Sequence, residues 1–176
     1  MLTDPAFSDR RKRFAELKQA EALLVMTLRL WAEPLRDPET MHPHWQDGLQ
    51  TAGLSNDAAV AFDTVMRITI ASATRALDVH RPGCSALGTD EARLLGMVRL
   101  IQQGDMAEAG TLLADWLPMS GVRMALAPLG ILAHALDRAG LRLPTLDNGL
   151  PATGRIIDFP QARRMARTDP GARLLH

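Results

Sequence analysis

The chain has 176 residues, 47% hydrophobic and 23% charged, proportions that fit one globular domain with a sizeable core. Its 20 basic and 20 acidic residues give a formal net charge of +0, which argues against electrostatic capture of nucleic acid or of an anionic membrane. The single cysteine excludes an internal disulfide and fits a reducing compartment. The longest apolar runs, Ala22–Ala32 and Val122–Leu136, are interrupted and shorter than the ~20 residues of a membrane span. We therefore expect a soluble cytoplasmic protein without a signal peptide.

The first predicted helix runs from about Ser8 to Glu33. Its apolar residues recur at helical spacing, and Pro34, which follows directly, is expected to mark its end. From Ala22 onward apolar side chains occur on most sides, which indicates that other elements surround the second half of this helix. Arg29 and Glu33 lie one turn apart on the remaining polar strip, and we expect them to form an ion pair.

A broken passage and another helix follow. Proline and glycine residues delimit a short helix near residues 43–52. Ser55 is a favourable N-cap for the next helix, because its hydroxyl can accept a hydrogen bond from the first turn. Thr69 and Ser72 share the core face of that helix with apolar residues. Their hydroxyls could line a pocket, but we favour hydrogen bonds back to a carbonyl one turn earlier.

Three further helices are expected before position 142. One starts at residue 89 or 90 and ends at a glycine, residue 104. The next begins at Asp105, which has a glutamate three residues later in the spacing of a capping box, and stops at proline 118. The last runs from about residue 120 to the glycine at 140. Pro128 lies inside it and is expected to kink it or to split it in two.

These elements predict an all-α fold, an irregular bundle of about five or six helices over residues 1–142. Residues 143–176 contain four prolines and little periodicity, so we expect an extended tail that packs on the body or on a partner. A repeat at an offset of 33 residues is also visible, with Leu54, Asp57, Ala59 and Val65 recurring as Leu87, Asp90, Ala92 and Val98. It indicates either stacked helical pairs or two amphipathic helices that start alike.

The stretch from Asp78 to Glu91 holds the cysteine and is the first candidate site. His80 and Cys84 could ligate zinc if His42 and His44, in the other loop-like passage, came close to them in space. A nucleophilic Cys84 would need a thiol activated by its surroundings and an orienting partner. The interpretation that we favour is a loop in which Cys84 packs as a small apolar side chain.

No glycine-rich phosphate loop, G-x-S-x-G, H-E-x-x-H or C-x-x-C motif occurs in the sequence. Basic clusters at the two ends, Arg10–Arg13 and Arg163–Arg167, provide a third and weaker hypothesis, nucleic-acid binding.

The apolar excess on the helices, Ile70 on an otherwise polar strip, and the three tryptophans as possible anchors favour an interaction surface. We therefore expect a non-enzymatic protein-interaction or regulatory module without a cofactor, which binds itself as a homodimer or binds another protein. The alternative is a small-ligand or metal-binding protein, or an enzyme, centred on the His80–Cys84 loop.

Overall fold

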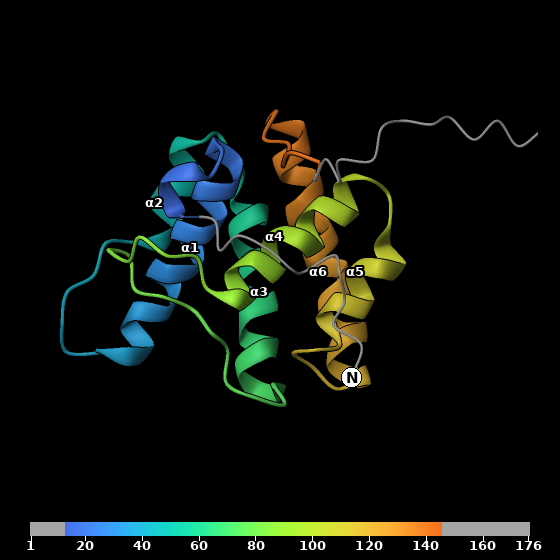
Figure 1. Cartoon of the computed structure of the whole chain (residues 1–176), viewed down its shortest axis with the longest axis horizontal. Coiled ribbons are helices and arrows are strands. Elements are labelled where there is room, and N and C mark those ends of the chain that lie inside the picture. Colours follow the sequence, from blue (N-terminus) through green and yellow to red (C-terminus); the bar gives the residue numbers. More distant parts are fainter. Residues whose placement is uncertain (1–12, 146–176) are drawn as a thin grey trace, which may run out of the picture. The chain divides into compact units, whose positions relative to one another are not determined.

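A computed structural model describes residues 13–145, and within this range the regular elements are all helical (Figure 1). The described part contains a 3₁₀ turn, η1 (Phe14–Glu16), and six α-helices: α1 (Gln19–Arg36), α2 (Trp45–Thr51), α3 (Asn56–Ser72), α4 (Thr89–Gln102), α5 (Met106–Leu113) and α6 (Met119–Arg138). An isolated antiparallel bridge joins Arg13 to Ala86. The predicted all-α fold is confirmed. Three predicted features lie outside the described residues: the tail from residue 146, both basic clusters except Arg13, and the first residues of the predicted first helix.

The first helix begins eleven positions later than predicted, at Gln19. The reason is local: the backbone N–H of Lys18 donates to the Glu21 carboxylate at 2.9 Å, which caps the helix at this point. Pro34 lies inside the last turn of α1 instead of following it. The helix continues to its end because the Asp37 N–H still donates to the Glu33 carbonyl at 2.9 Å.

Several other boundaries lie close to the predicted ones, but α5 ends at Leu113, before the predicted stop at Pro118. Gly53, Gly104 and Gly140 have positive φ angles of 79°, 89° and 74° and follow the ends of α2, α4 and α6, a conformation that glycine adopts without strain. Asp105 caps α5 by accepting the Glu108 N–H at 3.0 Å. Ser55 occupies the N-cap position of α3, but its hydroxyl makes no capping hydrogen bond.

Helix α6 is a single helix through Pro128, so of the two predicted outcomes, a kink or a split, the split is wrong. Buried side chains on both sides of the proline, including Ala125 and Leu129, keep both parts of the helix packed against the core. This packing compensates for the one backbone hydrogen bond that proline removes. By length and composition α6 could also cross a membrane, but 50% of that stretch is buried inside the body. The core helix of a soluble protein can have the same length and apolar composition.

The first three helices and the last three follow the same sequence of lengths: a long helix, a short helix and a long helix. Helices α1, α2 and α3 have 18, 7 and 17 residues, and α4, α5 and α6 have 14, 8 and 20. The segments Glu21–Leu30 (EALLVMTLRL) and Glu91–Leu100 (EARLLGMVRL), 70 positions apart, are identical at five of ten positions. Five of the seven buried residues of α3 also have buried counterparts 63 positions later in α6. We interpret the body as two related three-helix halves; the predicted 33-residue offset instead pairs α3 with α4.

Figure 1 shows α1 and α2 on one side, α5 and α6 on the other, and α3 and α4 between them. Helix α3 packs along α6, and α1 contacts α4. One continuous core joins the halves, and its largest fully buried apolar side chains come from both, among them Phe62, Leu28, Leu94, Trp116 and Leu132.

Candidate functional site: a groove between α1 and α3

The loop that joins the two halves, residues 73–88, is anchored by two buried carboxylates at the start of α4. The first belongs to Asp90, which accepts two hydrogen bonds from the Arg75 guanidinium at 2.7 Å, one from the Asp78 N–H at 2.7 Å and one from the Trp116 indole at 2.8 Å. Burial raises the pKa of Asp90, but these hydrogen bonds outweigh burial and lower the pKa to about 2.

The second carboxylate belongs to Glu91 and is fully buried together with its partner Arg29. Arg29 donates to it at 2.7 and 2.8 Å, and the backbone N–H groups of His80 and Gly88 donate at 2.9 and 2.7 Å. Burial opposes the charge, but these four donors outweigh burial and hold the pKa of Glu91 below its ordinary value. The carboxylate therefore connects α1, the loop and the first turn of α4.

Arg29 reaches the loop itself. Its guanidinium donates to the carbonyls of Cys84 and Ala86, both at 2.6 Å. The predicted ion pair between Arg29 and Glu33 is wrong, because Arg29 points inward to Glu91 while Glu33 pairs with Arg36 at 3.0 Å. Because Arg29 is fully buried, its charge needs a counter-charge, and Glu91 of α4 supplies it.

A second, reciprocal ion pair lies at the other end of α1, where Glu21 meets Arg99 of α4 at 3.1 Å. The glutamate near the start of each helix thus binds an arginine further along the other helix, so α1 and α4 run antiparallel. Each arginine follows its own helix's glutamate by eight positions, Arg29 after Glu21 and Arg99 after Glu91.

The structure brings together only part of the predicted zinc site. Cys84 Sγ lies 3.4 Å from His80 Nδ1, and His80 Nε2 lies 3.4 Å from an Asp78 carboxylate oxygen. His42 instead bonds to the Asp37 carbonyl at 2.7 Å. Within residues 13–145 no group of three or more His, Cys, Asp or Glu side chains is arranged to hold a metal ion, so His42 and His44 do not complete a site with His80 and Cys84.

Two core-facing hydroxyls behave as predicted. Thr69 donates to the Val65 carbonyl at 2.8 Å, and Ser72 donates to the Ile68 carbonyl at 2.7 Å. Both hydroxyl donors are therefore satisfied within α3 and need no ligand as an acceptor.

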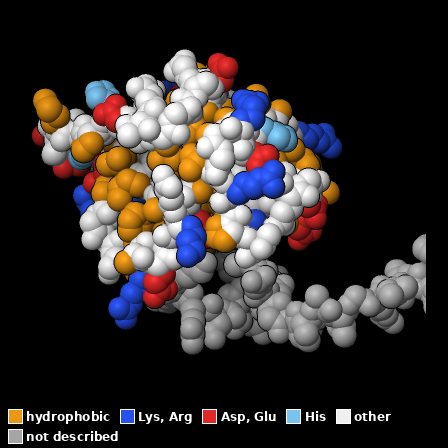
Figure 2. Space-filling view, turned by 90° about the horizontal axis from the view of Figure 1, so that it is seen from above, with side chains coloured by type: hydrophobic (Ala, Val, Ile, Leu, Met, Phe, Trp, Pro, Cys, Tyr) orange, Lys and Arg blue, Asp and Glu red, His pale blue; other side chains and the backbone are white. Residues whose placement is uncertain are grey.

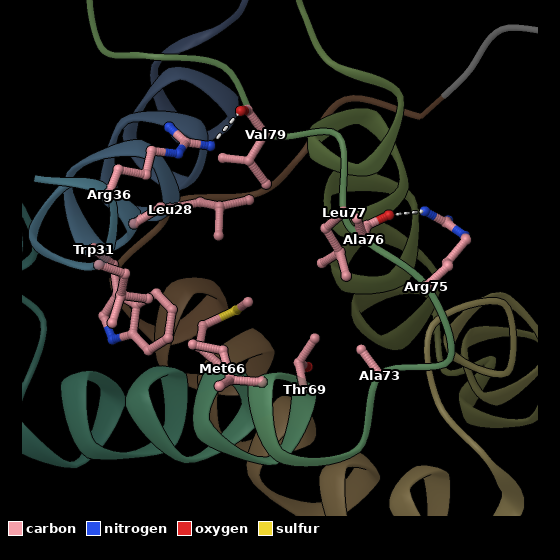
Figure 3. Close-up of a pocket in the computed structure, with 13 residues that line it drawn as sticks. Leu28, Trp31, Arg36, Met66, Thr69, Ala73, Arg75, Ala76, Leu77 and Val79 are labelled. Atoms are coloured by element: carbon pink, nitrogen blue, oxygen red, sulfur yellow. Dashed lines mark hydrogen bonds between the residues drawn. The ribbon is translucent and has the colours of Figure 1, made fainter.

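An apolar groove of about 270 Å³ lies between α1, α3 and the first part of the anchored loop. Figure 3 shows side chains of these three elements around one hollow, with Leu28 and Trp31 from α1, Met66 and Thr69 from α3, and Leu77 and Val79 from the loop. The remaining lining residues are Ala32, Leu35, Arg36, Ile70, Ala73, Arg75 and Ala76.

The wall and the rim of the groove are held by hydrogen bonds. The Trp31 indole N–H donates to Asp63 of α3 at 2.9 Å, which fixes the ring at one end. Arg36 donates to the Val79 carbonyl at 2.5 Å and so ties the loop to the end of α1 (Figure 3). Because the loop is also bound by Asp90 and Glu91, the hollow is preformed.

Apolar side chains continue from the hollow onto the surface. Leu35 is 60% exposed and Ile70 is 58% exposed, and both line the groove. Figure 2 shows a different view, the molecule seen from above, in which hydrophobic side chains lie among acidic and basic ones. Exposed apolar side chains beside an apolar hollow, such as Leu35 and Ile70, mark binding sites more often than single exposed residues do.

The chain matches no known protein family, no curated protein and no solved structure.

Proposed function

We propose that the protein is a non-enzymatic protein-interaction module that receives apolar side chains of a partner polypeptide in the groove between α1 and α3. The observation that carries this proposal is the preformed hollow with the half-exposed Leu35 and Ile70 beside it. Apolar anchors that enter a preformed pocket supply most of the energy of many protein interfaces.

The size and chemistry of the groove favour a side chain over a free ligand. Its volume of about 270 Å³ is slightly below the range of roughly 300–1,000 Å³ typical of small-molecule pockets. The polar side chains that line it are engaged within the chain, since Thr69 bonds to Val65, Arg36 to Val79 and Arg75 to Asp90. A polar ligand would find few free groups to orient it.

The alternative, a metal or small-ligand site at His80 and Cys84, is supported by the 3.4 Å contact between these two side chains. Native mass spectrometry after equilibration with zinc tests it. One tightly held zinc ion per chain that is lost in the Cys84→Ala variant would favour this alternative.

The proposed function is tested by selecting binding peptides from a random displayed library with the wild-type protein as bait. Selected peptides should carry large apolar residues, and calorimetry should show that their affinity falls at least about tenfold for Ile70→Glu. Ile131→Glu is the matched control, because Ile131 is 50% exposed on α6 and lies outside the groove. Equal binding to both variants, or a library without enriched binders, would contradict the proposal.

A further inference from the structure

We infer that the occupant of the groove is a second copy of this chain, packed groove to groove about a two-fold axis. The inference rests on the proposed function and names the partner of the same site. In this dimer Ile70 of each copy enters the hollow of the other copy.

The groove region is complementary to itself. It presents a hollow lined by Leu28, Met66 and Leu77, and beside the hollow it presents the protruding side chains of Leu35 and Ile70. A two-fold dimer requires one surface patch to offer both the pocket and the group that fills it. A partner with a different surface requires only the pocket.

The charges around the groove favour a neutral partner. Each charged side chain at the rim has an opposite charge within its own chain: Arg36 pairs with Glu33, Arg67 with Asp63, and Arg75 with Asp90. The rim therefore attracts neither a strongly acidic nor a strongly basic partner. The chain itself, with a formal net charge of +0, meets this condition.

The second half of the molecule shows how the same face is used when it is covered. The α6 residues that correspond to Met66, Thr69 and Ile70 at the 63-residue offset are fully buried, namely Leu129, Leu132 and Ala133. The α4 residues that correspond to Leu28 and Trp31 at the 70-residue offset are also buried, namely Val98 and Ile101. Helices α4 and α6 pack against each other there. Leu28, Thr69 and Met66 are themselves only 1–3% exposed, so the halves differ at two positions: Ile70 is 58% exposed where Ala133 is buried, and Trp31 is half-buried where Ile101 is buried. A second copy would cover Ile70 and Trp31.

A stable dimer buries about 1,600 Å² in total, which is more than a hollow of this size provides. The contact must therefore extend along the exposed strip of α3, where Val60 is 55% exposed and Arg67 lies between Val60 and Ile70. These residues fall on one side of the helix at spacings of seven and three positions.

Sedimentation equilibrium of the full chain tests the inference. The wild type and Ile131→Glu should both be dimers. Ile70→Glu and Leu35→Glu should raise the dissociation constant at least about tenfold, because every dimer contains each substituted residue twice. Both substituted residues are more than half exposed, so circular dichroism should show an unchanged helix content.

The outcomes separate this inference from the proposed function. A monomeric wild type that still binds selected peptides through Ile70 would overturn the dimer and leave the interaction module standing. A wild-type dimer that survives Ile70→Glu and Leu35→Glu but dissociates with Ile131→Glu would place the interface elsewhere and overturn the inference. A wild-type protein that neither binds selected peptides nor self-associates would overturn the dimer and the interaction module together.

Discussion

The buried pair Arg29–Glu91 should be among the most sensitive positions for stability. Both side chains are fully buried, and the carboxylate accepts four hydrogen bonds at 2.7–2.9 Å. Removing one member leaves the other charge buried without a counter-charge, which costs about 3–5 kcal/mol. We expect a loss of this size from Glu91→Gln and also from Arg29→Met, measured by urea denaturation at pH 7.

The double variant tests the physical reason. With neither charge present, the desolvation cost disappears on both sides, so the double variant should lose about 2 kcal/mol less than the sum of the two single losses. Arg67→Met is the control, because the exposed ion pair of Arg67 with Asp63 should contribute no more than about 0.5 kcal/mol. Additive losses, or a single-variant loss as small as that of the control, would refute the reasoning.

Three further predictions concern the loop and the helix ends. The pKa of Asp90 is lowered to about 2, so the ionised carboxylate stabilises the fold above about pH 4. This contribution, about 2 kcal/mol, is lost as the pH falls through about 2. Asp90→Asn should remove this part of the acid sensitivity, measured as the difference in the free energy of unfolding between urea titrations at pH 4 and pH 2. Cys84→Ala should change the free energy of unfolding by less than about 1 kcal/mol, because Arg29 binds the carbonyl of Cys84 and not its thiol; a larger loss would show that the thiol contact with His80 is structural. Gly104→Ala should lower the free energy of unfolding by about 1 kcal/mol, because the φ of Gly104 is 89°. Gly83→Ala is the control and should lower it less, because Gly83 has open space around it and no positive φ. Thermal melts of the two variants measure the difference.

The helices were largely predictable because their signals are local. Glycine at positions 53, 104 and 140 predicts three helix ends correctly, and the core face predicted for α3 holds the buried Thr69. The errors have two different causes. The start of α1 is set by a local contact, the Lys18 N–H that donates to the Glu21 carboxylate, whereas Pro128 is tolerated through tertiary packing, because residues on both sides of it are buried in the core.

The site was less accessible to sequence reasoning. The sequence indicates Ile70 and Trp31 as surface and anchor candidates, but the loop residues Leu77 and Val79, which form the other wall of the groove, carry no periodic signal. Their position depends on Asp90 and Glu91, which bind backbone groups of the loop. The similarity of residues 21–30 to residues 91–100 was a usable signal, since it predicts two related halves.

The reciprocal ion pairs also determine how the molecule opens. If one half unfolded while the other stayed folded, Glu21 and Arg29, or Glu91 and Arg99, would remain in a folded half without the charges that now neutralise them. Partial opening is therefore costly, and the two halves should unfold as one cooperative unit. In native-state hydrogen exchange, the slowest amides of α1 and of α4 should then report the same free energy of opening.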